Sequence, residues 1–194
     1  MSADTHSLKF QEKLGYGLGD AASNFFFQTF NLFLLYYYTD VFGLAPAAVG
    51  TLFLVTKIVD AVSDPAMGLV ADRTDSRWGK FRPYLLWAAI PYGFFGYAMF
   101  FSPDLSATGK LIYAYATYTL MMLAYTAINV PYSALMGVIS PSSTERTKVA
   151  AYRFIAAFTA GWLIATFVTP LKNILGGGDE EVGFRLTMGI FAVV

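Results

Sequence analysis

The sequence predicts an all-α polytopic membrane protein, because of its composition and the spacing of its charges. Of the 194 residues, 56% are hydrophobic and only 13% are charged, and the mean hydropathy is +0.52. Four stretches contain no Asp, Glu, Lys or Arg: residues 21–39, 83–103, 111–144 and 154–171. A soluble domain distributes its charges more evenly, whereas a helix that crosses a bilayer needs about 20 mainly apolar residues. The uncharged stretches have roughly that length or more.

The apolar runs divide the chain into a polar cytoplasmic N-terminus, residues 1–13, and a transmembrane bundle, residues 14–194. Spans are expected at about 14–39, 47–70, 84–102, 110–137 and 149–171, with an incomplete span at 186–194. The last run would rise only about 14 Å as a helix, about half the thickness of the hydrocarbon core. We therefore expect a truncated last helix and a longer natural protein. The alternative is a short sixth helix whose end is buried or snorkels to the interface.

The distribution of basic residues predicts the orientation of these spans. Eight Lys and Arg residues fall on the side of the N-terminus and three on the other side. They are Lys9, Lys13, Arg73, Arg77, Lys80, Arg82, Arg146 and Lys148 against Lys110, Lys172 and Arg185. Because cytoplasmic loops are enriched in Lys and Arg, we expect the N-terminus in the cytoplasm and the protein in the cytoplasmic (inner) membrane. Tyr36, Tyr37 and Tyr38 would then anchor the outer end of the first span at the interface.

Two classes of chemistry are excluded by composition. The chain has no cysteine, which excludes disulfides and thiolate catalysis. Its formal net charge is zero and its basic residues form no long run, so no nucleic-acid partner is indicated.

Five charged residues within the predicted spans are the most informative feature of the sequence: Asp20, Lys57, Asp60, Asp64 and Arg153. An ionised side chain at the centre of a membrane helix costs roughly 2.5 to 3.5 kcal/mol, so each should face a cavity or a partner. Three carboxylates and two cations leave one negative charge without compensation, which a bound Na⁺ or H⁺ would supply. The alternatives are full pairing with one protonated carboxylate, or a Lys or Arg from a missing part of the protein.

The spacing of the charges in the second span sharpens this hypothesis. Lys57, Asp60 and Asp64 are spaced i, i+3, i+7 and share one helix face. Carboxylates are suitable ligands for a hard cation, with help from a hydroxyl or amide on another helix. Pro65 should bias Asp64 away from the helical conformation and free nearby carbonyl groups, unless it merely kinks the span.

A polar face on the first span and an arginine in the fifth predict a second cluster. Asp20, Asn24, Gln28 and Asn31 follow one another at steps of four, four and three residues. Arg153 keeps its charge in a protein, so it should pair with Asp20 or reach substrate hydroxyls, unless it snorkels to the cytoplasmic surface.

The fourth span presents an amide between two phenol rings. Tyr125, Asn129 and Tyr132 are spaced i, i+4, i+7 on one face. Amide and phenol groups beside aromatic faces suit a neutral polyol such as a sugar. The alternative is an aromatic helix interface with one satisfied Asn.

Three motifs carry a resemblance to a known family. The run from Gly68 to Pro83 resembles the cytoplasmic signature of the major facilitator superfamily. Together, Tyr37-Tyr38-Thr39-Asp40, Lys57-x-x-Asp60-x-x-x-Asp64-Pro65 and Ser76-Arg77-Trp78-Gly79-Lys80-Phe81 resemble the glycoside–pentoside–hexuronide:cation symporters, the melibiose permease family. The resemblance covers nearly the whole chain.

This resemblance implies the N-terminal six-helix half of a major facilitator fold, with the last helix truncated. It implies a transporter, not an enzyme, that moves a sugar or glycoside inward with Na⁺, Li⁺ or H⁺ and uses no other cofactor. The expected partners are the sugar or glycoside, the coupling cation, the lipid bilayer and the missing C-terminal half.

The resemblance also implies roles for individual residues. Asp60, Asp64 and Thr126 match the cation ligands, which would hold Na⁺ if sodium is the coupling ion. The positions that match or lie beside the sugar contacts are Asp20, Asn24, Tyr125, Asn129 and Arg153. Lys57 stands where melibiose permeases have an Arg, in a coupling or pairing role. Asn129 replaces an Asp and Ser133 a Trp, which argues against melibiose itself. Asp72, Arg73 and Arg77 match the cytoplasmic gate, although their charges could also only fix topology.

Three other functions compete with sugar symport. A major facilitator transporter of a non-sugar substrate remains open, but an anion carrier should have surplus basic residues in its spans. A half-size homodimeric carrier would need a complete sixth helix. An aspartyl-protease-like enzyme is disfavoured because Asp60 and Asp64 stack along one helix, whereas a catalytic dyad faces across a cleft.

Overall fold

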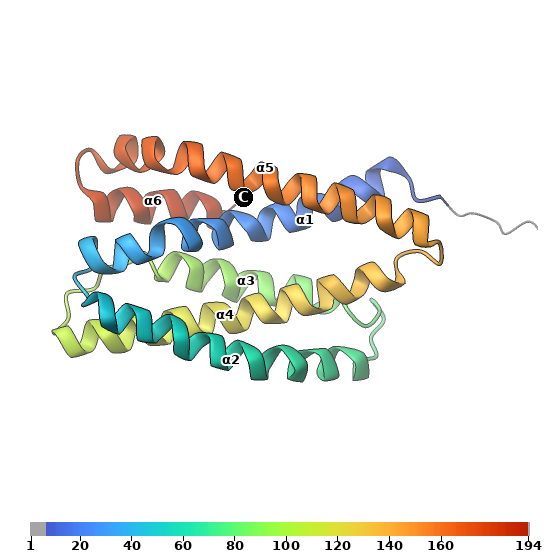
Figure 1. The fold of residues 1–194 in the computed structure, drawn as a ribbon, viewed down its shortest axis with the longest axis horizontal. Coiled ribbons are helices and arrows are strands. Elements are labelled where there is room, and N and C mark those ends of the chain that lie inside the picture. The colour runs from blue at the N-terminus through green and yellow to red at the C-terminus, as the bar shows by residue number, and fades with distance from the viewer. Residues whose placement is uncertain (1–6, 194) are drawn as a thin grey trace, which may run out of the picture.

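A computed structural model describes residues 7–193, which form a bundle of helices running along a common direction (Figure 1). The helices are α1 (Phe10–Thr29), α2 (Pro46–Arg73), α3 (Arg82–Ala98), α4 (Ala107–Val138), α5 (Ser143–Gly176) and α6 (Glu180–Val193). The described residues contain no strand, which confirms the all-α prediction. By length and hydropathy, α2, α4 and α5 each qualify as membrane-spanning helices within this part of the chain.

The first helix does not stop at Thr29. It continues through two π-helical segments, η1 (Phe30–Leu34) and η2 (Tyr37–Val41), and ends before Gly43, whose φ is +81°. π-Helical turns widen a helix locally and often occur near functional sites. The continuous helical run therefore covers the whole of the first predicted span.

Local sequence signals set several of the other helix ends. Pro46 and Pro83 occupy the first turns of α2 and α3, where the missing N–H of proline costs no hydrogen bond. The Ser106 hydroxyl accepts a hydrogen bond from Gly109 N at the start of α4, at 3.2 Å. Gly177 ends α5 in the left-handed conformation, with φ of +56°.

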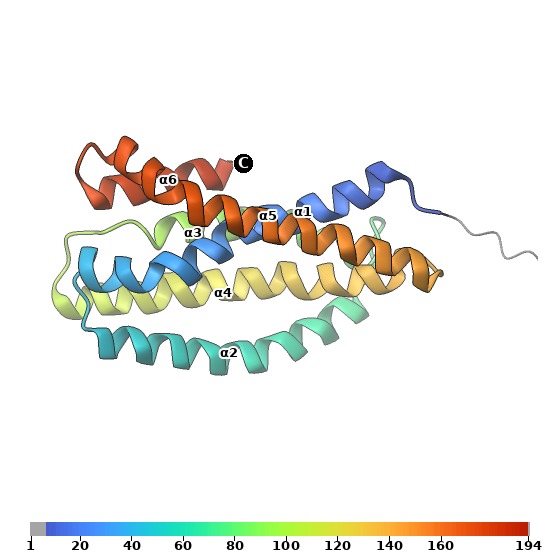
Figure 2. The same ribbon diagram turned by 45° about the horizontal axis from the view of Figure 1, so that its top comes forward.

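Pro65 does not interrupt α2, contrary to one of the two expectations for this residue. The helix is continuous from Pro46 to Arg73, and in Figure 2 it is visibly bowed along its length. A proline removes one backbone hydrogen bond but the flanking turns can keep their geometry, so it bends a long helix more readily than it ends it. Asp64 therefore stays in helical backbone, and the alternative of a bend is the correct one.

The contacts between helices form one continuous series through the bundle. α1 packs along α5, α6 lies between α5 and α3, and α4 packs against α2 and α3 (Figures 1 and 2). Large apolar side chains on the outside of this arrangement are exposed, which suits a lipid surface and not water. Examples are Ile58, Val62, Trp87, Ile90, Phe94, Phe158 and Trp162.

The end of the bundle opposite the N-terminus contains an aromatic core. Tyr37 lies 4.8 Å from Phe100 and 5.4 Å from Phe184 between ring centroids. Tyr37 and Tyr38 are 0% and 1% exposed, and only Tyr36, at 40%, reaches the surface. The prediction that all three tyrosines anchor the helix at the interface is therefore wrong for two of them. Tyr37 faces α6 and the segment that follows α3, and its burial depends on those distant segments.

Candidate functional site

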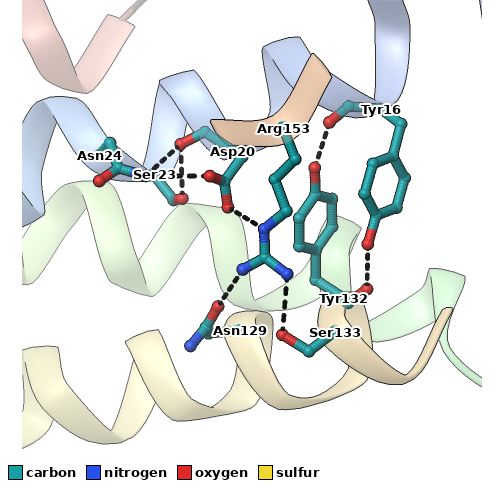
Figure 3. A network of polar contacts seen from close by, with 8 residues as sticks. All are labelled: Tyr16, Asp20, Ser23, Asn24, Asn129, Tyr132, Ser133 and Arg153. Atoms are coloured by element: carbon teal, nitrogen blue, oxygen red, sulfur yellow. Dashed lines mark hydrogen bonds and ion pairs between the residues drawn. The ribbon is translucent and has the colours of Figure 1, made fainter. Parts of the chain in front are cut away.

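The first polar cluster joins α1 to α5 in the middle of the bundle. Arg153 Nε donates to Asp20 Oδ1 at 3.0 Å (Figure 3), and the two side chains are 19% and 7% exposed. Asn24, one turn after Asp20, donates to the Asp20 backbone carbonyl at 2.8 Å and to Oδ2 at 3.3 Å. The predicted pairing of Arg153 with Asp20 is confirmed, and Arg153 does not snorkel to the surface.

Arg153 also reaches α4 with its two remaining nitrogens. Nη1 donates to Ser133 Oγ at 3.3 Å and Nη2 to Asn129 Oδ1 at 3.5 Å (Figure 3). Both bonds are long compared with a normal charged hydrogen bond of about 2.8 Å. One guanidinium group therefore connects three helices, strongly to α1 and weakly to the polar groups of α4.

A pair of stacked tyrosines lies directly beside this cluster. The rings of Tyr16 and Tyr132 are 4.3 Å apart at an interplanar angle of 9°. The Tyr16 hydroxyl donates to the Tyr132 carbonyl at 2.7 Å, and the Tyr132 hydroxyl donates to the Tyr16 carbonyl. Sequence reasoning missed Tyr16, although its position one turn before Asp20 on the same helix face was an available signal.

The second polar cluster lies between α2 and α4. Lys57 Nζ lies 3.3 Å from Asp60 Oδ2, and Thr126 Oγ1 donates to Asp64 Oδ1 at 2.8 Å. Asp60 Oδ1 is buried and has no hydrogen-bond partner among residues 7–193. Asp64 has a neutral hydroxyl partner and forms no ion pair within the described chain. Among the three acidic residues inside the predicted spans, Asp64 is therefore the one that has no basic partner in the described chain.

A cavity lies at the second cluster, and the first cluster reaches it only through Asn129. The cavity has a volume of about 240 Å³ and is lined by Phe27, Lys57, Asp60, Asp64, Met122, Tyr125, Thr126 and Asn129. Tyr125 is fixed there by stacking on Phe27, with 5.1 Å between ring centroids and an angle of 13°. Asn129 belongs to both sets, because it lines the cavity and also accepts from Arg153.

The donor set in this cavity suits a hard cation. Two carboxylates and a hydroxyl offer only oxygen ligands, which Na⁺ and other hard cations prefer. The unpartnered, buried oxygen of Asp60 has a lone pair free for such a contact. Nowhere in the described chain do three or more His, Cys, Asp or Glu side chains gather as a metal-binding group.

The three residues matched to the cytoplasmic gate lie where α2 ends and in the loop after it. Arg77 lies over the Trp78 ring, 5.2 Å from its centroid, and the Asp72 carbonyl accepts from Lys80 Nζ at 3.2 Å. The side chains of Asp72, Arg73 and Arg77 are exposed and form no ion pair with the rest of residues 7–193.

Two further ion-pair groups fasten the helix ends, and neither was predicted. Glu145 lies 2.7 Å from Lys13 and 2.8 Å from Lys148, which joins the starts of α1 and α5. At the other end Glu180 pairs with the buried Lys172 and accepts from the Tyr36 hydroxyl. These two hydrogen bonds lower the pKa of the Glu180 carboxyl below its ordinary value.

Comparison with known proteins identifies the family. Residues 15–194 match the model of a family described as MFS/sugar transport protein. The chain belongs to this family. The predicted resemblance to the glycoside–pentoside–hexuronide:cation symporters is thereby confirmed. The family consists of multi-pass membrane transporters, not enzymes.

Several relatives are similar along nearly the whole chain. It is 47% identical to the inner membrane symporter YicJ of Escherichia coli (strain K12) over 187 residues, which cover 96% of this chain and 41% of YicJ. It is 38% identical to the isoprimeverose transporter of Lactiplantibacillus pentosus over 185 residues, which cover 94% of this chain and 39% of that protein. The chain therefore spans about two-fifths of the length of these relatives.

Proposed function

We propose that this chain is part of a symporter that carries a sugar or glycoside across the cytoplasmic membrane together with Na⁺ or H⁺. The observation that carries this proposal is one cavity in which a carboxylate without a cationic partner lies beside an aromatic ring and an amide. The carboxylate attracts a cation, and the ring and the amide suit a polyol, so the cation and the polyol can bind in the same cavity. The family's description as sugar transport protein and the name of YicJ as a symporter support this reading.

The coupling cation binds at Asp60, Asp64 and Thr126. The free oxygen of Asp60 and the Asp64 carboxylate supply negative charge, and the Thr126 hydroxyl supplies a neutral ligand. Lys57 holds Asp60 while the cation is absent, and its side chain, 65% exposed, can move away when the cation arrives. Li⁺ has the same ligand preferences and can replace Na⁺.

The sugar binds at the neighbouring polar groups, Asp20, Asn24, Tyr125, Asn129 and Arg153. Asp20 and Asn129 offer acceptors for hydroxyl groups, Asn24 and Arg153 offer donors, and the face of Tyr125 suits the C–H face of a sugar ring. The 240 Å³ cavity is smaller than the roughly 300 to 1,000 Å³ of typical small-molecule sites. A second half of the transporter would complete it.

The chain supplies the N-terminal half of the transporter, with its N-terminal segment on the cytoplasmic side. The exposed side chains of Asp72, Arg73 and Arg77 close the cytoplasmic side by pairing with charged residues of the C-terminal half. A closed gate of this kind alternates with an open one as the two halves rock about the central site.

Uptake of labelled neutral glycosides, pentoses and hexuronides into cells that produce the full-length protein tests this function, with and without Na⁺ and at two external pH values. Asp64→Asn and Asp60→Asn should each abolish stimulation by the cation while some sugar binding remains, because each removes a charged oxygen ligand. Asp104→Asn, in the loop before α4 and outside the cavity, is the matched control. Unchanged cation stimulation in both cavity variants contradicts the proposal.

A further inference from the structure

The guanidinium group of Arg153 is held by hydrogen bonds and by an aromatic ring. Along its edge, Nε makes the short bond to Asp20, whereas the bonds to Ser133 and Asn129 are long, at 3.3 and 3.5 Å. Arg153 Cζ also lies over the Tyr132 ring, 5.1 Å from its centroid. A planar guanidinium stacks well on an aromatic ring, which a lysine ammonium would not do in the same way.

The Tyr132 ring is itself fixed in position. It stacks on the Tyr16 ring, and the hydroxyl of each tyrosine donates a hydrogen bond to the backbone carbonyl of the other. Both residues are only 7% exposed. Gly19 makes room for the ring, because a Cβ at this position would lie 3.3 Å from Tyr132 Cε2. The ring cannot rotate without breaking these contacts, so it forms a rigid surface between α1 and α4.

We propose that Tyr132, locked by Tyr16, is a positioning residue that orients the guanidinium of Arg153. Asp20 fixes one edge and the Tyr132 ring fixes the plane, so that Nη1 and Nη2 point into the site in a defined direction. The two long bonds to Ser133 and Asn129 are then the ones that ligand hydroxyls exchange with, while the short bond and the ring contact persist. The effect on transport rests on the proposed function, but the orientation of Arg153 does not.

Chemical modification of Arg153 tests the orientation without any substrate. The full-length protein, purified in detergent, is treated with phenylglyoxal, and the modified peptides are quantified by mass spectrometry with the exposed Arg77 as internal reference. Tyr132→Leu should raise the modification rate of Arg153 about tenfold, since the guanidinium loses the ring that covers its face. Tyr132→Phe keeps the ring and should stay within about twofold of the wild type. Tyr113→Leu, on α4 at the opposite end, is the control and should leave the rate unchanged.

If Tyr132→Leu does not fold, Tyr132→Met is the second variant, because its flexible side chain can fill the space left by the ring but has no aromatic face. It should give the same increase in the modification rate of Arg153. The inference is overturned if Arg153 is modified at the wild-type rate in a folded Tyr132→Leu or Tyr132→Met variant. An equal increase in Tyr132→Phe also overturns it, because the hydroxyl and not the ring would then be responsible.

Glycoside affinity gives the second readout. Tyr132→Leu should weaken binding about tenfold, with Tyr132→Phe restoring it. If the wild type binds no glycoside while the modification rates follow the expected order, the proposed function fails and the positioning role stands. If Tyr132→Leu binds glycoside with normal affinity and the modification rate of Arg153 is unchanged, the positioning role is contradicted and the proposed function stands.

Discussion

The charged residues inside the bundle show how burial decides what an ion pair is worth. The Asp20 and Arg153 side chains are largely buried, whereas Lys148, at the start of α5, is 54% exposed beside Glu145. Removing one member of a buried pair leaves an uncompensated charge, whereas an exposed pair contributes little because water already solvates it. The two pairs therefore have different consequences for stability.

Asp20→Asn and Arg153→Gln should each lower the free energy of unfolding by about 3 to 5 kcal/mol, because each strands a buried charge. The double variant should lose clearly less than the sum of the two, since neither charge is then left alone. Thermal unfolding of the full-length protein in detergent measures this. Lys148→Gln is the control and should cost about 1 kcal/mol or less, because Lys148 is 54% exposed and Glu145 keeps its ion pair with Lys13. Additive losses in the double variant argue that the two groups do not interact.

At the scale of helices, glycines set how closely α5 and α6 approach. A Cβ placed on Gly183 of α6 would overlap the carbonyl oxygen of Lys172 on α5, which is backbone and cannot turn away. A Cβ placed on Gly15 of α1 would meet no other atom of the described residues within 4 Å, although the four-residue spacing of Gly15 and Gly19 suggests close packing. Gly19, one turn later, faces Tyr132 instead.

Gly183→Ala should destabilise the protein by about 1 to 3 kcal/mol, because α6 must move away from α5 to admit a methyl group. Gly15→Ala is the matched control in an open helical position, and it should be neutral or stabilise by up to about 1 kcal/mol through helix propensity. Thermal unfolding in detergent separates the two. Equal melting temperatures for both variants and the wild type mean that α5 and α6 are not in backbone contact at Gly183.

At the scale of the whole molecule, the described residues line one small cavity and leave the proposed gate residues exposed. The Asp72, Arg73 and Arg77 side chains point to the surface, and the relatives are about two and a half times as long as the matched region, which covers 41% of YicJ. Alternating access in this kind of transporter normally requires two halves that rock about a central site.

Residues 1–194 alone should therefore catalyse no saturable sugar uptake. Proteoliposomes that contain only this chain should take up labelled glycoside no faster than empty liposomes, with or without a Na⁺ gradient. The full-length protein in the same liposomes is the positive control. Saturable uptake by residues 1–194 would instead support the half-size homodimeric carrier.

The positions of the helices, and the charges inside them that need an explanation, follow from the amino-acid sequence alone. Apolar length and the cost of an ion in hydrocarbon are properties of each segment by itself, so they can be evaluated before the fold is known. The motif that contains Asp60 and Asp64 likewise resembles the family, and it can be recognised because its residues are close together in the sequence.

Which groups meet is a property of the tertiary fold. Arg153 pairs with Asp20 across 133 residues, Thr126 donates to Asp64 across 62, and Tyr16 locks Tyr132 across 116. The burial of Tyr37 and Tyr38 also depends on distant aromatic residues, including Phe100 and Phe184. The physical reason is that helix periodicity fixes which residues share a face, whereas the packing of helices fixes which faces touch.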